Sequence, residues 1–209
     1  MIAGAASPAR TEGRWGPLRA ADACRTYETV SFEAVHPSLV PRLSGGRARI
    51  LDVGSGSGRD AAWLTDKGHE VHAVEPSQAM RLGTMAHHPA GRFRVLGDAL
   101  PCLAHVPRTF GDAFDVVLCS AVLMHLGLED ARRSVVRMVE LVRPGGILHV
   151  TVRTPRLGET DVACVSRADL VSWAGREARE IEGAEGVPDA KRGDVTWSWS
   201  TLERRRGRS

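Results

Sequence analysis

The chain has 209 residues, 43 % of them hydrophobic and 25 % charged, and a formal net charge of +3 at pH 7. This composition is ordinary for a soluble globule, and the length suits one domain with a substantial hydrophobic core. Much of the basic excess lies in the arginine-rich stretch 204–209, and the body of the chain has no basic stripe, which argues against a nucleic-acid partner.

The four cysteines show neither a metal-ligand spacing nor a dense disulfide pattern. We therefore expect reduced, mostly buried thiols in a cytoplasmic protein. No apolar run approaches the roughly 18 residues of a membrane span, and the N-terminus lacks the charged and apolar regions of a secretory signal. The histidines, including His87 and His88 in a predicted surface turn, do not converge with other ligands, so we expect no metal site.

Residues 1–20 lack hydrophobic periodicity, and we expect a poorly ordered lead-in. Residues 21–45 form an expected N-terminal cap, with helical potential interrupted by Pro37 and Pro41. Strand and helix patterns then alternate, with a loop or short helix at 101–113. The expected strands are 48–53, 70–74, 92–96, 114–120 and 147–152, and the expected helices are 58–67, 76–85 and 129–141.

The C-terminal part differs, because a helix at 166–174 is followed by strand patterns at 178–182 and 195–202 with no helix between them. Ser166 and Asp169 are spaced as a capping box. The strand patterns predict an antiparallel pair at the sheet edge, with Trp197 and Trp199 on one face in sheet packing rather than in base stacking. Together the elements predict an α/β fold, mostly parallel, with a single domain over 21–203 and a disordered basic tail.

The most informative stretch is the end of the first expected strand, where Asp52 is followed by three alternate glycines, Gly54, Gly56 and Gly58. Glycines let the chain turn sharply and approach a ligand without Cβ clashes. Glu75 ends the next expected strand, where a carboxylate of a βαβ unit suits a bidentate bond to ribose hydroxyls. The alternatives are that Asp52 only shapes the turn, and that Glu75 is a helix N-terminal acid favoured by the helix dipole.

A nicotinamide enzyme is the obvious competitor, because its fingerprint G-x-G-x-x-G also follows a first strand. Here the sixth position of that pattern is Arg59. A diphosphate packed against a helix N-terminus prefers a small residue, whereas a guanidinium suits a carboxylate. The loop therefore favours a nucleoside ligand that carries an amino-acid tail.

Five segments, in order and at the usual distances, resemble the class I S-adenosylmethionine-dependent methyltransferases. They are ILDVGSGSG at 50–58, Glu75, GDA at 97–99, FDVVLCS at 114–120 with MHL at 124–126, and LVRPGGIL at 141–148. Residues 25–36 and 195–197 also resemble one bacterial subgroup, whose acceptors are mostly unassigned. The resemblance implies a Rossmann-like, doubly wound sheet of seven strands with an antiparallel last strand, and it implies S-adenosyl-L-methionine as the cofactor.

The resemblance also implies roles for residues at matching positions. Those expected around the methionine part of the cofactor are Asp52, Gly54, Ser55, Gly56, Gly58 and Arg59. Those expected around the ribose and adenine are Glu75, Pro76, Ser77, Asp98, Ala99 and Leu100. Those expected near the sulfonium are Cys119, Ser120 and His125. Tyr27 would be a lid residue, and its alternative is a packed aromatic on an N-terminal helix.

Methyl transfer from a sulfonium depends on aligning nucleophile, methyl and sulfur more than on covalent help. A general base assists when the acceptor is a hydroxyl or a protonated amine. His125 is the first candidate base, because it follows the fourth expected strand at the edge where ligands of such folds bind. His36, on the expected cap, is the second candidate, and Tyr27 is a further catalytic candidate. For both histidines the alternative is a structural role.

The acceptor is less well determined than the cofactor. No Asn-Pro-Pro-aromatic run follows the fourth expected strand, where the sequence is SAVL at 120–123, and this argues against methylation of amino groups on nucleic-acid bases. No large insertion forms a docking domain for a macromolecule. We therefore expect a small-molecule O or N acceptor. The alternatives are a protein or RNA acceptor guided by the arginine tail, a cofactor-binding module without catalysis and, more distantly, a nicotinamide enzyme.

Overall fold

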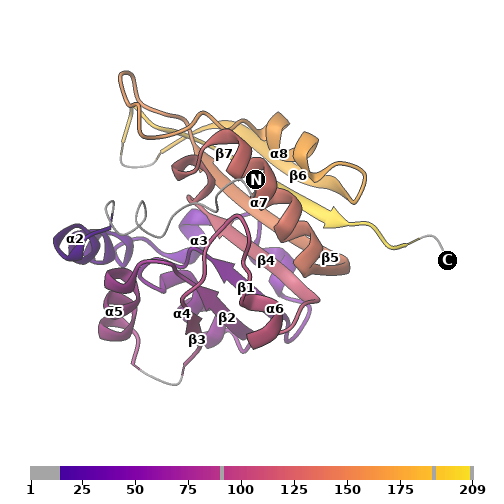
Figure 1. Ribbon diagram of the computed structural model, residues 1–209, viewed down its shortest axis with the longest axis horizontal. Helices are drawn as coiled ribbons and strands as arrows, with labels where there is room; N and C mark the ends of the chain where they lie inside the picture. The colour runs from indigo at the N-terminus through magenta and orange to yellow at the C-terminus, as the bar shows by residue number, and fades with distance from the viewer. Residues whose placement is uncertain (1–14, 90–91, 190–191, 208–209) are drawn as a thin grey trace, which may run out of the picture.

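The computed structural model describes residues 15–89, 92–189 and 192–207 and contains a seven-stranded sheet with helices on both faces (Figure 1). The order of the strands is β3-β2-β1-β4-β5-β7-β6. The first five strands are parallel, and β7 lies antiparallel between β5 and β6, which confirms the predicted fold class. The strands are β1 (Arg49–Val53), β2 (Glu70–Val74), β3 (Arg94–Leu96), β4 (Phe114–Ser120), β5 (Val142–Arg153), β6 (Ala178–Pro188) and β7 (Thr196–Arg204).

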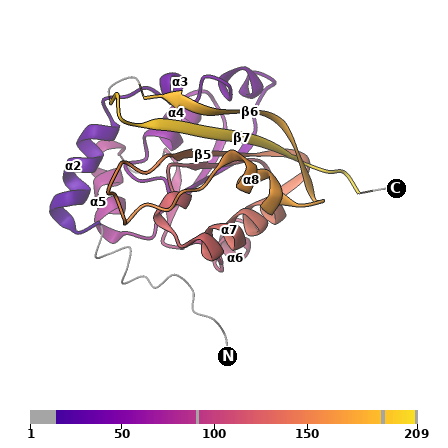
Figure 2. The same ribbon diagram turned by 90° about the horizontal axis from the view of Figure 1, so that it is seen from above.

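Two layers of helices enclose the sheet (Figure 2). One face carries α3 (Phe32–Val35), the short helix η1 (Val40–Leu43) and α4 (Arg59–Asp66), and the other carries α6 (Val106–Thr109), α7 (Leu128–Leu141) and α8 (Arg167–Ala174). A hydrophobic core lies on each face of the sheet, and alternate residues of the central strands pack into one or the other. Ile50 and Leu118 face α4, whereas Leu51 and Val117 face α7. Burial on both faces explains why these strands are continuous apolar runs.

The N-terminal helix α2 (Pro17–Tyr27) begins inside the stretch that we expected to be a poorly ordered lead-in. Pro17 occupies a first helical position, where its missing N–H costs nothing. The helix packs along α5 (Gln78–His87), with Cys24 Sγ 3.7 Å from Met80 Sδ, and the two helices lie side by side in Figures 1 and 2. The rest of the expected lead-in, residues 1–14, lies outside the described residues.

The C-terminal part follows the prediction closely at α8 and departs from it at the strands. Ser166 and Asp169 form the predicted capping box. Strand β5 begins at Val142 rather than at 147, because Val142 pairs with Phe114 before the register shifts at the Pro144–Gly146 turn. Strand β7 includes Arg204, whose guanidinium donates to the carbonyls of Glu140 and Val142, so Arg204 is not part of a disordered tail as expected.

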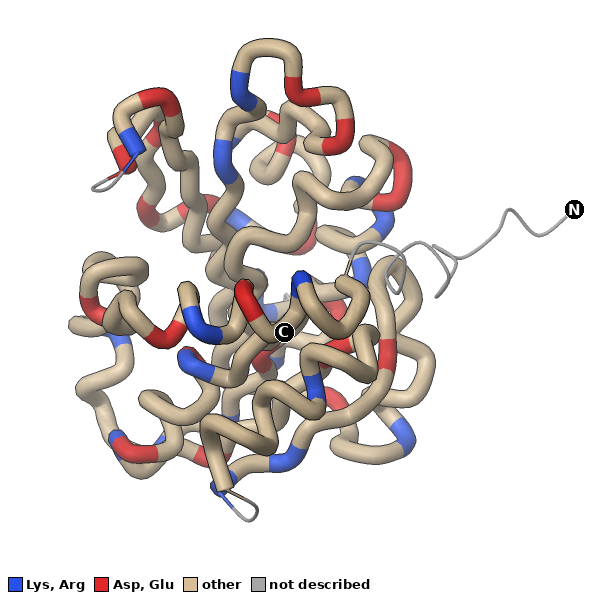
Figure 3. Tube along the Cα trace, turned by 90° about the vertical axis from the view of Figure 1, so that its left-hand side faces the viewer, with Lys and Arg blue, Asp and Glu red and all other residues tan. Residues whose placement is uncertain are grey.

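Charged residues of both signs are interspersed along the trace on the side that Figure 3 shows. Among the described helices, none is long and apolar enough to cross a membrane.

Candidate functional site

The loop between β1 and α4 has the left-handed backbone that its three glycines allow. The φ angles of Gly54, Gly56 and Gly58 are +76°, +56° and +85°. The Gly54 N–H donates to the carbonyl of Val74 at 2.7 Å, which joins the loop to the end of β2. A Cβ on Gly54 would lie 2.4 Å from a methyl group of Val122, in the turn after β4. The loop is therefore pressed between the carboxyl ends of β2 and β4, where parallel sheets bind ligands.

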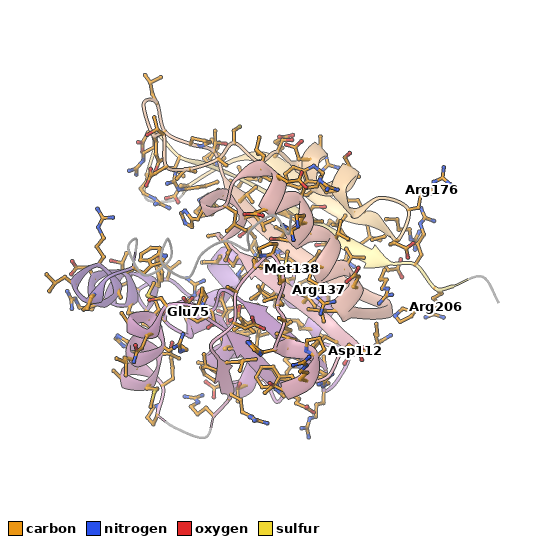
Figure 4. The ribbon with its side chains drawn as sticks, viewed as in Figure 1. Glu75, Asp112, Arg137, Met138, Arg176 and Arg206 are labelled. Atoms are coloured by element: carbon orange, nitrogen blue, oxygen red, sulfur yellow. The ribbon has the colours of Figure 1, made fainter. Side chains whose placement is uncertain are left out.

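Glu75 lies directly after β2 and is 5 % exposed. Its Oε2 accepts the Gly56 N–H at 3.0 Å, and its Oε1 accepts the Ser77 N–H at 2.8 Å. Burial raises the pKa of this carboxyl above its usual range, although the two N–H donors and Arg81 oppose the shift. Figure 4 shows Glu75 inside the molecule, on the side of α2 and α5. Each oxygen keeps one lone pair, so a ligand's hydroxyls can still be accepted.

Two polar atoms beside the glycine loop are buried and have no hydrogen-bond partner among the described residues. They are Oδ2 of Asp52 and Oγ of Ser55. Burial raises the pKa of Asp52 well above its usual range, with Asp60 and Glu75 acting in the same direction and Arg59 opposing them. Buried polar groups in folded proteins are nearly always paired, so these two atoms have unmet capacity for a polar ligand.

Arg59 begins α4 and turns its guanidinium back toward the N-terminal segment. Its Nε donates to Oδ1 of Asp60 at 2.7 Å, and its Nη1 donates to the carbonyl of Tyr27 at 3.5 Å. Oδ2 of Asp60 accepts from Nε2 of His36 at 3.1 Å. His36 is 0 % exposed and packs against the ring of Phe32, so the structure does not bring this second candidate base to a position that an acceptor could reach.

The residues expected around adenine are brought to the same edge of the sheet. Ser77 caps α5, and Pro76 adjoins it. Asp98, with Ala99 and Leu100, follows β3. The Asp98 carboxylate accepts the N–H groups of Ala99, His105 and Val106, so it organises the loop that leads to α6. This carboxylate role was not predicted, and it holds that edge of the site in place.

Two of the residues expected near the sulfonium, Cys119 and Ser120, are successive residues of β4 and so point to opposite faces of the sheet. Cys119 is fully buried among the apolar residues that face α7, and burial raises the pKa of its thiol, so only its backbone can reach a ligand. Ser120 lies at the end of β4, where its Oγ is 3.2 Å from Oγ1 of Thr151. Ala121 follows with a φ of +57°, a rare backbone for a residue other than glycine, and strain of this kind often marks functional sites.

Two aromatic residues of the N-terminal segment, Tyr27 and Trp15, lie next to the glycine loop and the end of β2. The ring of Tyr27, at the end of α2, is 3.6 Å from where a Cβ on Gly56 would stand. The backbone carbonyl of Trp15 accepts a hydrogen bond from Ser77 Oγ at 3.3 Å. The Trp15 ring lies edge-on to the His125 ring, with 6.2 Å between the ring centroids. The N-terminal segment therefore joins the end of β2 to the turn that carries the first candidate base.

Sequence reasoning missed several members of this site. Trp15 stood in the expected lead-in, and the signal that could have found it is the Gly16-Pro17 helix start directly after it. Thr84 donates to the Gly56 carbonyl at 2.8 Å from the buried side of α5. Asp60 was given no role in the sequence analysis. Within the described residues, no group of three or more His, Cys, Asp or Glu side chains is arranged to hold a metal.

Comparison with known proteins finds a family model described as "Methyltransferase domain" that matches residues 51–150. The chain is 27 % identical over 134 residues to the ubiquinone biosynthesis O-methyltransferase of Sinorhizobium medicae, covering 64 % of this chain and 52 % of that protein. It is 26 % identical over 185 residues to an uncharacterized methyltransferase of Mycobacterium tuberculosis, covering 83 % of this chain and 65 % of that one. The chain thus spans about half the length of the ubiquinone-biosynthesis relatives that it matches.

Among solved structures, one similar fold is that of 1,6-didemethyltoxoflavin-N1-methyltransferase from Burkholderia thailandensis, with bound 1,6-didemethyltoxoflavin and S-adenosylhomocysteine. The TM-score is 0.66 at 21 % sequence identity, and the match covers 99 % of this chain and 94 % of that one. At this identity the likeness concerns the fold alone.

Proposed function

We propose that the chain is a class I S-adenosylmethionine-dependent methyltransferase, which binds S-adenosylmethionine and transfers the methyl group to a small-molecule oxygen or nitrogen acceptor. The acceptor half of this proposal is supported by the names of similar proteins. One methylates oxygen in ubiquinone biosynthesis, and one methylates N1 of a small heterocycle.

One observation carries the proposal: Asp52 Oδ2 and Ser55 Oγ are buried and unpartnered beside a glycine loop with positive φ angles. Their chemistry fits the methionine part of the donor, whose ammonium group donates hydrogen bonds and whose carboxylate accepts them. An ionised Asp52 carboxylate also attracts the ammonium and the sulfonium. A nicotinamide dinucleotide offers a diphosphate at this place, which the Asp52 carboxylate would repel.

The chain's own residues divide the work of binding and orientation. Glu75 supplies lone pairs for ribose hydroxyls while its N–H bonds fix the glycine loop. Arg59 supplies guanidinium N–H groups for a carboxylate. When bound, S-adenosylmethionine supplies a methyl group already activated by a positively charged sulfur. His125, in the turn after β4, is the proposed base that takes a proton from a hydroxyl or ammonium acceptor.

A macromolecular acceptor guided by the arginine tail finds little support. Arg204 is tied to the carbonyls of Glu140 and Val142, at the start of β5, and Arg206 lies against Gly145. In Figure 4, Arg206 lies near the C-terminus, across the molecule from Glu75. The tail therefore leaves from the amino ends of the parallel strands, opposite the edge that carries the glycine loop.

The test is titration calorimetry of the purified protein with S-adenosylmethionine and with S-adenosylhomocysteine. We expect both to bind, and binding of neither would refute the proposal. Transfer is then assayed with a methyl-labelled donor against panels of phenols, carboxylic acids and heteroaromatic amines. Cell extracts and RNA are assayed as acceptors in the same way. If the donor binds but no acceptor is methylated, the chain is better described as a cofactor-binding module without catalysis. Removing residues 205–209 leaves β7 at its full length and deletes three arginines of the tail. If the full chain methylates RNA or protein and the shortened chain does not, the macromolecular acceptor is the better assignment.

A further inference from the structure

A buried chain of hydrogen bonds connects the N-terminal cap to the first residue of α4. Asp60 is 6 % exposed and divides its carboxylate between two donors, Oδ1 with Arg59 at 2.7 Å and Oδ2 with His36 at 3.1 Å. Although burial acts to raise it, His36 and Arg59 hold the pKa of Asp60 below its usual range. The carboxylate is therefore ionised, and it accepts from both neighbours.

His36 is locked in place by its surroundings. Its ring lies 4.8 Å from that of Phe32 and 5.5 Å from that of His149, edge-on to the latter. His149 is in turn hydrogen-bonded to Oγ1 of Thr201 on β7 at 2.9 Å. Since Asp60 can only accept, Nε2 of His36 carries the proton in this contact. The imidazole thus fixes one oxygen of Asp60 from the sheet side, and the other oxygen faces Arg59.

The guanidinium of Arg59 is only partly used by these contacts. Its acceptors among the described residues are Asp60 Oδ1, on Nε, and the Tyr27 carbonyl, on Nη1. A guanidinium has five N–H donors in a rigid fork, so fixing the Nε edge against a carboxylate sets the direction of the remaining donors. The Arg59 side chain is 19 % exposed and faces the Tyr27 backbone, next to the ring that covers Gly56.

We propose that Asp60 and His36 are positioning residues: Asp60, held by His36, orients Arg59 so that its free N–H groups receive the carboxylate of the methyl donor. This inference rests on the proposed function. His36 belongs to the segment 32–43 that covers the sheet, so the same contact couples docking of the cap to recognition of the donor's amino-acid tail. Asp60 and His36 act through Arg59 and need not touch the ligand themselves.

The experiment compares two donors that differ only in this group, S-adenosylmethionine and its decarboxylated form. We expect Asp60→Asn to raise the dissociation constant of S-adenosylmethionine by about tenfold or more, and that of the decarboxylated form by less than about threefold. In the background of Arg59→Ala, adding Asp60→Asn should change neither dissociation constant further, because there is no longer a guanidinium for Asp60 to orient. His36→Leu should show the same donor selectivity with a smaller effect, since the Arg59–Asp60 bond remains.

Matched controls separate positioning from folding. Asp66→Asn alters an exposed carboxylate at the other end of α4 and should leave both constants unchanged. Thermal unfolding of each variant reports whether it folds. If His36→Leu does not fold, the double-mutant cycle of Arg59→Ala and Asp60→Asn still tests whether Asp60 acts through Arg59. Equal weakening of both donors by Asp60→Asn, or full additivity with Arg59→Ala, would overturn the inference. If the wild-type protein binds neither donor, the proposed function itself fails.

Discussion

The backbone N–H of Gly56 donates to Oε2 of Glu75 at 3.0 Å, so the glycine loop and the acid at the end of β2 form a single hydrogen-bonded unit. The second oxygen of the same carboxylate holds Ser77, which begins the next helix. One buried side chain thereby sets the distance between the parts of the site expected to contact methionine, ribose and adenine. This relationship gives Glu75 a structural role in addition to its proposed role in binding.

Replacing Glu75 by alanine should weaken binding of S-adenosylhomocysteine by about 1–3 kcal/mol, the scale for a hydrogen bond to a charged group. It should also lower the melting temperature without ligand, because the N–H groups of Gly56 and Ser77 lose their acceptor. Calorimetry and thermal denaturation measure the two effects. Glu70→Ala is the control, since Glu70 starts the same strand but is half exposed. An unchanged dissociation constant for Glu75→Ala would show that the ribose assignment is wrong.

Replacing Asp52 by asparagine should stabilise the protein at neutral pH while weakening donor binding. Burial raises the pKa of Asp52. At a pH above the unfolded-state pKa of about 3.9, the folded protein must therefore either bury a charged carboxylate or bind a proton that the unfolded chain has released, and either one lowers its stability. That cost grows as the pH rises from about 4 toward the raised folded pKa. The melting temperature of Asp52→Asn should therefore exceed that of the wild type at pH 7.5, and the difference should shrink toward pH 4.

Asp115 provides the opposite control for this pH dependence. Burial acts to raise its pKa, but the Arg49 N–H at 2.7 Å and the Arg143 side chain at 2.5 Å bring the pKa below its usual range. A lowered pKa contributes stability above about pH 3.9 that is lost as the pH falls. Asp115→Asn should thus be less stable than the wild type at pH 7.5, and this gap should persist to about pH 4 and close only below it. Two variants that shift in the same direction would contradict the assignment.

The sequence predicted the elements whose signal is local. Strands 70–74 and 114–120 have the bounds that alternation and dense apolar patterning indicated, and the capping box at Ser166 is present. The start of α2 was missed because proline is usually taken as a helix breaker, although at the first position it favours a helix. The start of β5 was missed because the Pro144–Gly146 turn interrupts the pattern while the pairing continues on both sides.

The candidate site was predictable only where its residues follow one another in the chain. The glycine loop and Glu75 belong to one βαβ unit, whose order fixes their proximity. The pairing of His36 with Asp60, and the contact of Trp15 with His125, depend on how the N-terminal segment crosses the sheet edge. No periodicity encodes such contacts. For the same reason the full burial of His36, the second candidate base with a structural role as its alternative, could not be predicted.

Glycines with positive φ should differ in their tolerance of alanine according to the space around them. Gly58→Ala and Gly68→Ala both place a side chain at a left-handed position, with φ of +85° and +89°, which costs about 1–2 kcal/mol each. A Cβ on Gly58 would also lie 2.6 Å from a methyl of Thr84, whereas nothing lies within 4 Å of a Cβ on Gly68. Denaturant unfolding should show a larger loss for Gly58→Ala, by about 1 kcal/mol or more. Equal losses of stability would mean that α5 shifts away from the new Cβ at no cost, and so would contradict the prediction.

Replacing His125 by asparagine should separate binding from transfer. If His125 is the base, kcat with a hydroxyl or ammonium acceptor should fall by about 10²–10⁴-fold, while the dissociation constant of S-adenosylhomocysteine should change by less than about threefold. His87→Asn, an exposed histidine at the end of α5, is the matched control and should leave both quantities unchanged. Because the Trp15 ring packs edge-on to His125, a loss of packing would instead weaken binding and transfer together. An unchanged kcat would mean that alignment of the acceptor alone drives the transfer.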